Sequence, residues 1–277
     1  MPPGRTTIDL HTHLHPPRLF AAIRRWFADK SDWDLNGQPT EPPEVAAVLR
    51  AAGVERFVFF SYAHKPGIAR ELNAWLTATA RALSGYGIPL GTVHLDDPDY
   101  RAIARAALDD GCAGFNVHED VQRLLLDDPR FDPVLSEVEL RRGLVIAHVG
   151  PIPWRYDAGP GAARVERVLQ RHPDLNLVVA HMGVPDTRDY VRLMERYANL
   201  YLDTTMVFAR GTPVEQHGVE RELLRANAER IVYGTDFPNI PYAYGAERAG
   251  VESLELGPAA EQAIFYDNAA RLLSAFV

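Results

Sequence analysis

Residues 8–17 read IDLHTHLHPP, and this stretch distinguishes between two possible α/β folds, an open sheet and a closed barrel. The apolar-rich start is typical of a buried strand, and three histidines, His11, His13 and His15, follow at every second position. An open, doubly wound α/β sheet usually carries a glycine-rich phosphate turn after its first strand. Histidines stand in its place here, which favours the closed barrel of parallel strands over the open sheet.

The rest of the chain alternates between short runs rich in Val, Ile, Leu and Phe and stretches with helical periodicity. Such alternation predicts βαβ units and a parallel sheet. The apolar runs are 7–10, 56–61, 89–93, 113–117, 144–147, 175–180, 200–203 and 230–233. The helical stretches are 41–53, 68–87, 97–111, 132–143, 161–172, 186–198, 219–229 and 257–276. Strict alternation of this kind predicts an α/β fold, a (β/α)₈ TIM barrel, with residues 1–277 forming a single domain.

Two connections are too long to be plain turns, at about 15–40 and 237–256. Both follow predicted strands, so we expect them to lie over the C-terminal mouth of the barrel. Long loops in compact domains are often lids or binding loops. An insertion that only packs on the rim is the alternative.

Composition and charge exclude several classes of protein. The net charge is −8, from 29 Lys and Arg against 37 Asp and Glu, which argues against a nucleic-acid surface or a basic membrane patch. No apolar run approaches the roughly 20 residues of a membrane span, and the first residues lack an apolar signal core, so a cytoplasmic protein is the default expectation. The single cysteine, Cys112, excludes an internal disulfide and a cysteine-based zinc site.

Metal-binding side chains stand at the ends of several predicted strands. They are His11 and His13 on the first, His118 on the fourth, His148 on the fifth, His181 on the sixth and Asp236 on the eighth. All strand ends of a parallel barrel meet at the face that carries the active site. Because residues i and i+2 of a strand point the same way, His11 and His13 can offer nitrogens to one ion. Imidazole and carboxylate together suit Zn²⁺ and similar first-row ions.

Two histidines are expected to have no part in that cluster. His15 comes after the predicted strand end, where Pro16 and Pro17 turn the chain, so we expect a rim residue or a substrate contact. His172 precedes Pro173 at a helix end and is expected to be exposed to solvent.

Six segments carry a resemblance to a known family: IDLHTHLH, AGFNVHED, VIAHVG, LNLVVAHMG, NLYLDTT and RIVYGTDFP. Together they resemble the amidohydrolase superfamily. The resemblance is closer to its amidohydrolase-related (amidohydrolase 2) branch, which includes aminocarboxymuconate-semialdehyde decarboxylase and various hydrolases. The matching segments span residues 8–238, which is most of the chain.

The resemblance implies a metal site and its ligands. His11, His13, His148 and Asp236 match the family's ligand positions. Asp236 is also expected to accept the proton of the metal-bound water and to pass it to the leaving group as general acid. His181 matches the strand-six histidine that positions or deprotonates a water, and that is itself a ligand in some members. One divalent ion is implied, with Zn²⁺ as the default and Mn²⁺, Fe²⁺, Co²⁺ or Ni²⁺ fitting the same ligands. Members of the branch often form homo-oligomers.

One departure from the family pattern concerns the number of metals. Binuclear members often place a carboxylated lysine on strand four, whereas here strand four reads GFNVH and neither lysine of the chain lies there. The site is therefore expected to be mononuclear, with a bridging Glu119 as the alternative. His118 is left open as a substrate contact, a weak ligand or a structural residue.

Hydrolysis is the predicted reaction, because a divalent ion activates water and polarises a carbonyl. The substrate would be a lactone, ester or amide. A metal-dependent, non-oxidative decarboxylase of an unsaturated or aromatic acid is the alternative, and a non-catalytic metal-binding barrel is a third reading. The residues expected to contact a small-molecule substrate are His118, His64, Arg155, Arg210 and Asn239. Arginines at the mouth favour a substrate with a carboxylate, although arginine is simply abundant in this chain.

Overall fold

The computed structural model describes residues 6–30, 33–150, 160–209 and 219–276. Its strands are β1 (Thr7–His13), β2 (Val54–Phe60), β3 (Gly87–Pro89), β4 (Gly114–His118), β5 (Leu144–His148), β6 (Asn176–Val179), β7 (Leu200–Asp203) and β8 (Ile231–Val232). Its α-helices are α1 (Pro17–Lys30), α2 (Pro42–Ala51), α3 (Ala69–Ala82), α4 (Tyr100–Asp109), α5 (Glu119–Gln122), α6 (Asp132–Leu140), α7 (Gly161–Arg171), α8 (Thr187–Met194), α9 (Arg221–Ala226), α10 (Ala246–Glu252), α11 (Pro258–Gln262) and α12 (Asn268–Leu272).

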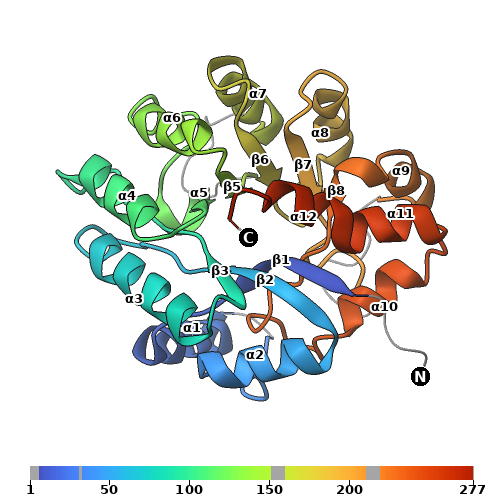
Figure 1. Ribbon diagram of the computed structural model, residues 1–277, viewed down its shortest axis with the longest axis horizontal. Coiled ribbons are helices and arrows are strands. Elements are labelled where there is room, and N and C mark those ends of the chain that lie inside the picture. Colours follow the sequence, from blue (N-terminus) through green and yellow to red (C-terminus); the bar gives the residue numbers. More distant parts are fainter. Residues whose placement is uncertain (1–5, 31–32, 151–159, 210–218, 277) are drawn as a thin grey trace.

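The strands are parallel and follow one another in chain order. β1, β2 and β3 pair in one run, and β4 to β8 pair in a second. Isolated bridges join the two runs at both seams, between Gly91 and Phe115 and between Thr12 and Phe237. The helices surround the strands as an outer ring (Figure 1). The predicted TIM barrel is therefore confirmed.

Alternating side chains divide the apolar core into an inner and an outer part. The inner cluster contains pairs of residues two apart on neighbouring strands, including Ile8, Leu10, Val58, Phe60, Leu144 and Ile146. Successive strand side chains point to opposite faces, so such pairs share the barrel interior. Leu272 and Leu273 join the same cluster, and α12 crosses the centre of the ring (Figure 1). The C-terminal helix thus covers one end of the barrel.

The outer faces of the strands pack against the helices. On one side, Phe57 and Phe59 of β2 contact residues of α2 and α3, such as Leu49 and Leu76. Around the rest of the ring, the outward residues of β4 to β8 form one continuous cluster with α4, α6, α7 and α8. This double layer of burial keeps the strand ends, and any side chains on them, in fixed positions.

The two long connections contain helices rather than loop structure alone. Pro17 opens α1 within the first connection, where its fixed φ suits the first helical position. Among the residues of α1, only Phe20 is buried, and Trp26 is 58% exposed. α10 lies within the second connection. No helix in the described ranges has the length and apolar character needed to cross a bilayer.

The expectation that His172 is exposed was wrong, because its side chain is buried beside α6. Only 4% of its surface is accessible. Its ring nitrogens lie 3.3 Å from Asp132 Oδ1 and 3.3 Å from Glu139 Oε2. Two carboxylates on one helix therefore keep this polar ring inside the protein.

Candidate metal centre

An irregularity in β1 positions His11 and His13. The pairing of β1 with β2 shifts register between Asp9 and Thr12. A regular strand would place Asp9 on the same face as His11. Instead the Asp9 carboxylate accepts hydrogen bonds from Thr235 Oγ1 at 2.7 Å and from the Tyr244 hydroxyl at 3.0 Å. Asp9 Oδ1 also accepts the His11 backbone N–H at 3.2 Å, while the rings of His11 and His13 turn toward Asp236.

The carboxylate of Asp236 brings the two histidines together. Asp236 Oδ1 lies 3.1 Å from His11 Nε2 and 2.8 Å from His13 Nε2. Asp236 follows β8 and is 8% exposed, and its backbone N–H donates to His11 O at 2.8 Å. Its φ of +67° lies in the left-handed region, which non-glycine residues seldom adopt. Such backbone conformations concentrate at functional sites, where the surrounding structure enforces them.

Two further histidines complete the cluster. His148 ends β5, and His181 follows β6 at the start of a short 3₁₀ turn, His181–Gly183. One donor atom each from His11, His148, His181 and Asp236 lie within 4.8 Å of one another. The His181 backbone, with φ of +55°, is also left-handed, and its ring Nδ1 lies 3.0 Å from Thr205 O.

The structure brings together all five residues predicted for the centre. The group of four donors includes His181, which was expected beside the metal, and leaves out His13, which was expected as a ligand. His13 keeps its contact with Asp236 through Nε2. The exact ligand set therefore stays a prediction.

Buried imidazole nitrogens without hydrogen-bond partners fit a divalent metal. Within the described ranges they include Nε2 of His11 and Nδ1 of His13 and His148. His11 Nε2 lies near Asp236 Oδ1 without hydrogen-bond alignment. A buried polar atom that lacks a partner is costly, and a cation held between His11 Nε2 and the Asp236 carboxylate would remove that cost at His11. Imidazole and carboxylate are suitable donors for such an ion.

The protonation states agree with a cation site. Burial raises the pKa of Asp236, but the neighbouring His13 and His11 outweigh it and hold that pKa below its usual value. Burial lowers the pKa of His11, but Asp203 and Asp236 outweigh it and raise that pKa to about 10. Burial, followed by neighbouring histidines, lowers the pKa of His148 well below its usual value. A metal ion binding here would have to displace a proton from His11.

The sequence profile of the amidohydrolase family matches residues 8–274. The chain belongs to the amidohydrolase family. No curated protein matches its sequence. Membership of this family is in keeping with a barrel that gathers histidines and an aspartate at its strand ends.

Several solved structures share the fold of this amidohydrolase. An uncharacterised TIM-barrel protein from Bordetella bronchiseptica is 24% identical, with a TM-score of 0.72 over 98% of this chain and 99% of its own. A 5-carboxyvanillate decarboxylase from Novosphingobium aromaticivorans, complexed with manganese and 4-hydroxy-3-methoxy-5-nitrobenzoic acid, is 17% identical, with a TM-score of 0.69 over 99% and 97%. A probable 2-pyrone-4,6-dicarboxylic acid hydrolase from Acinetobacter baumannii, with citric acid bound, is 15% identical, with a TM-score of 0.67 over 97% and 99%.

A cavity of about 210 Å³ opens beside the amidohydrolase centre. His118, His148, His181 and Val184 are among its lining residues. The rings of His118 and His148 stack at 4.5 Å between centroids with an interplanar angle of 5°. His118 Nδ1 accepts a long hydrogen bond, 3.4 Å, from the Val121 backbone N–H. His118 is therefore both a wall of the cavity and the cap of α5.

The other predicted substrate contacts lie in different surroundings. Asn239 is buried, and its Nδ2 lies 3.2 Å from His15 Nε2. His64 is exposed, and its backbone N–H donates to Tyr62 O. Arg155 and Arg210 lie outside the described residues.

His15 is not a rim residue. It is 3% exposed, its Nδ1 lies 2.8 Å from Ser61 Oγ, and its ring stacks on that of His13 at 5.4 Å. His15 is therefore buried although it lies beyond the predicted strand end, because α1 and Asn239 cover it.

Glu119, the alternative bridging ligand, has another partner. Arg164 Nε donates to Glu119 Oε1 at 2.9 Å, and Arg164 Nη2 donates to Glu119 Oε2 at 2.7 Å. Leu126 N also donates to Oε1. Both carboxylate oxygens thus face hydrogen-bond donors, which fits the expectation of a mononuclear site.

Asp203 at the end of β7 was missed at the level of the sequence. Its Oδ2 lies 2.8 Å from His11 Nδ1. The segment NLYLDTT contains this aspartate at a predicted strand end, so the rule that identified Asp236 could have identified it too. It was overlooked because no family ligand position falls there.

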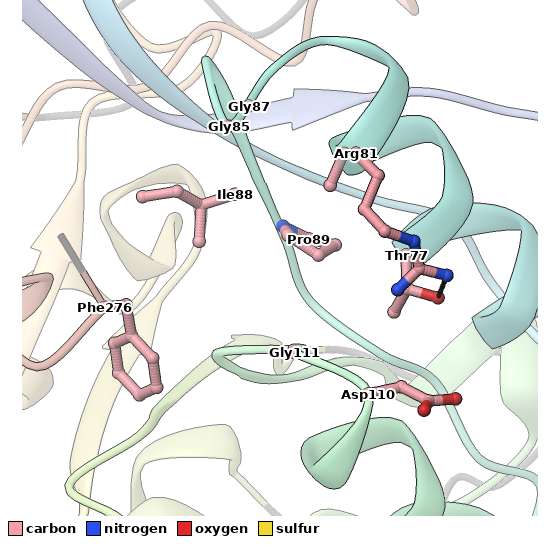
Figure 2. Close-up of a pocket in the computed structure, with 10 residues that line it drawn as sticks. Thr77, Arg81, Gly85, Gly87, Ile88, Pro89, Asp110, Gly111 and Phe276 are labelled. Carbon is pink, nitrogen blue, oxygen red and sulfur yellow. Dashed lines mark hydrogen bonds between the residues drawn. The ribbon is translucent and has the colours of Figure 1, made fainter.

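A second cavity, of about 370 Å³, lies at the opposite end of the barrel (Figure 2). Gly87 at the start of β3, Gly111 before β4 and Phe276 near the C-terminus are among its lining residues. These positions adjoin the N-terminal ends of the strands. The cavity is therefore separate from the candidate metal centre.

Proposed function

We propose that this amidohydrolase is a metal-dependent hydrolase that attacks a carbonyl-type C–O or C–N bond of a small molecule. The observation that supports this proposal most strongly is the position of the buried Asp236 carboxylate. Its Oδ1 lies 3.1 Å from His11 Nε2 and 2.8 Å from His13 Nε2. His148 and His181 place further donor atoms within 4.8 Å. A lactone, ester or amide fits this arrangement.

The proposed metal ligands are His11, His13, His148 and Asp236, with His181 beside them or as a further donor. When bound, a divalent ion would supply Lewis acidity that polarises a substrate carbonyl and acidifies water. Zn²⁺ is the default for these donors, and Mn²⁺ is an alternative because it accompanies the similar decarboxylase structure.

Asp236 is suited to move the proton in the reaction. Its carboxylate lies in the middle of the cluster and has oxygens that can accept a proton from the attacking water. The same carboxyl can then return that proton to the leaving oxygen or nitrogen. Burial keeps bulk water from competing for the proton.

His181 is suited to act as a base or as a ligand. Thr205 O can only accept a hydrogen bond, so the proton of neutral His181 lies on Nδ1. The lone pair is then on Nε2. A neutral His181 can therefore take a proton or bind a cation, and it could donate to an oxyanion only after protonation.

Decarboxylation of an unsaturated or aromatic acid is the second candidate. His118 and His148 both line the cavity beside the centre, and imidazole rings can stack on a planar substrate. The similar fold of a 5-carboxyvanillate decarboxylase also supports this candidate. The metal ligands would be the same for both reactions.

Metal removal and reloading test the proposal. Chelator-treated protein should be inactive, and activity should return with Zn²⁺ or Mn²⁺. A panel of lactones, esters and amides followed by proton release, beside aromatic and unsaturated acids followed by CO₂ release, decides between the two reactions. His11→Ala should lose metal, whereas His172→Gln, at a buried histidine remote from the centre, should keep it. Equal metal content in the two variants, or no binding of a divalent ion by the wild type, would overturn the proposal.

A further inference from the structure

The strand β7 supplies no member of the four-donor group, yet its last residue contacts two of them. Asp203 is fully buried. Its Oδ2 lies 2.8 Å from His11 Nδ1, and its Oδ1 accepts the His181 backbone N–H at 2.8 Å. Oδ1 also accepts the Thr205 backbone N–H at 3.1 Å. One carboxylate thus connects the end of β1 with the turn after β6.

We infer that Asp203 is a positioning residue, which sets the ring orientation and proton position of His11 and the backbone conformation of His181. The expected effect of Asp203 on metal affinity rests on the proposed function. Its effect on which His11 nitrogen carries a proton does not, and that effect can be measured in the metal-free protein.

The His11 part follows from the chemistry of a carboxylate. An ionised carboxylate only accepts hydrogen bonds, so its contact with Nδ1 keeps a proton on that nitrogen. The other carboxylate oxygen, Oδ1, accepts the backbone N–H groups of His181 and Thr205, so both oxygens of Asp203 face hydrogen-bond donors, as suits the ionised form. Nε2, the nitrogen nearest Asp236, is then the one left to bind a cation. Carboxylate partners of this kind orient metal-binding histidines and raise their basicity.

The His181 part follows from its backbone. A φ of +55° places a residue with a side chain in the left-handed region, which is less stable than the right-handed one. The hydrogen bond from His181 N to a charged acceptor offsets this cost, because charge-assisted bonds are stronger than neutral ones. Thr205 O, two residues beyond Asp203, accepts the ring Nδ1 of the same histidine. The end of β7 thus fixes both the main chain and the ring of His181.

Asp203→Asn separates positioning from simple structural support. Asparagine has one acceptor oxygen and one donor nitrogen. Its oxygen can still accept hydrogen bonds from the backbone N–H groups of His181 and Thr205. The amide nitrogen then faces His11 Nδ1. To accept a hydrogen bond from this amide, His11 Nδ1 must lose its proton, which leaves the ring protonated on Nε2 alone. The variant should therefore stay folded and carry the wrong His11 tautomer for metal binding.

The experiment compares wild type, Asp203→Asn, Asp203→Ala and Asp97→Asn. Asp97 is a matched control, because it is a buried aspartate that accepts a backbone N–H, from Gly67, and contacts none of the four donors. Long-range ¹H–¹⁵N NMR of metal-free protein labelled in histidine reports which His11 nitrogen is protonated. Competition with a chelator reports the Kd for Zn²⁺, and urea unfolding reports stability.

In Asp203→Asn, His11 Nδ1 should lose its proton, and the Kd for Zn²⁺ should rise about 10- to 100-fold. Asp97→Asn should stay within about twofold of wild type. The inference would be overturned if His11 Nδ1 kept its proton in Asp203→Asn. It would also be overturned if this variant were less stable than wild type but bound Zn²⁺ with the same Kd. If the wild type binds no Zn²⁺ or Mn²⁺, the proposed function fails, and the NMR comparison still decides the role of Asp203.

Discussion

Arg164 and Glu119 form a doubly hydrogen-bonded ion pair with almost no access to solvent. Their side chains are 0% and 1% exposed, and Arg164 Nη2 also donates to Gly150 O at 3.0 Å. The pair therefore ties α7 to the end of β4 and to the chain after β5, and Glu119 is itself among the residues that line the cavity beside the metal centre. The cost of burying two charges is offset only while both partners are present.

Arg164→Ala is expected to lower the free energy of unfolding by about 3–5 kcal/mol, because it leaves the Glu119 carboxylate buried and unpaired. Urea denaturation measures this. Arg188→Ala removes an exposed partner of Glu220, with side chains 62% and 60% exposed, and should cost less than about 1 kcal/mol. Similar losses in the two variants would show that the buried pair contributes no more than a surface pair.

Asp236→Asn is expected to lower kcat by about 10²- to 10⁴-fold on whichever substrate the panel identifies, because the amide cannot accept the proton. Metal content measured on the same sample separates a lost base from a lost ligand. Asp97→Asn is again the control and should retain full activity. Wild-type kcat in a metal-loaded Asp236→Asn protein would rule out the acid–base role.

Cys112 is expected to react with a thiol reagent only after unfolding. Its side chain is 2% exposed, and burial together with Asp110 raises the pKa of the thiol from 9.0 to about 12. The neutral thiol is therefore favoured in the folded state. Because this is the only cysteine, the reaction in urea and in buffer at pH 8 can be compared without correction.

The same shift predicts how the contribution of Cys112 to stability depends on pH. Below about pH 9 the thiol is neutral in both states and contributes no pH dependence. Between about pH 9 and pH 12 only the unfolded state loses the proton, so stability falls as the pH rises. The difference in unfolding free energy between wild type and Cys112→Ala should narrow over that range, and a constant difference would contradict the shift.

Gly250→Ala is expected to destabilise the protein by about 1–3 kcal/mol through overpacking. A Cβ on this residue of α10 would lie 1.9 Å from the backbone oxygen of Phe208. Glu247, one turn earlier, accepts the N–H groups of Phe208 and Ala209, so α10 contacts the chain after β7 at both points. At Gly245 an added Cβ meets nothing within 4 Å, and Gly245→Ala should be neutral or slightly stabilising. Equal melting temperatures of the two variants would contradict this, because they would show that the chain after β7 moves to make room for the added methyl group at no measurable cost in stability.

The barrel could be predicted from the sequence because its signals are local. Runs such as 144–147 and 200–202 are apolar throughout, since both faces of these strands are buried. β8 was expected at 230–233 and pairs as a strand only at Ile231–Val232. Strand ends depend on pairing partners, so the strand boundaries were predicted less accurately than the number of strands.

The centre could be predicted in part for the same reason. Each of His11, His13, His148, His181 and Asp236 lies at or just beyond a strand end, and parallel topology alone places such residues on one face. The α1 helix, the burial of His15 and the Arg164–Glu119 pair depend on contacts between distant segments. Periodicity within a short window carries no information on those contacts.

The order and type of elements, and the convergence of histidines with Asp236, were determined by the sequence itself, because hydrophobic periodicity and strand direction are properties of consecutive residues. Tertiary structure alone decided the orientation of each ring. Where β1 shifts register, the Asp9 carboxylate binds the side chains of Thr235 and Tyr244, and Asp203, 192 residues further along from His11, accepts the proton of the His11 ring Nδ1. The first effect requires the pairing of β1 with β2, and the second requires the closed barrel, which brings the end of β7 to His11 although β1 and β7 are not paired.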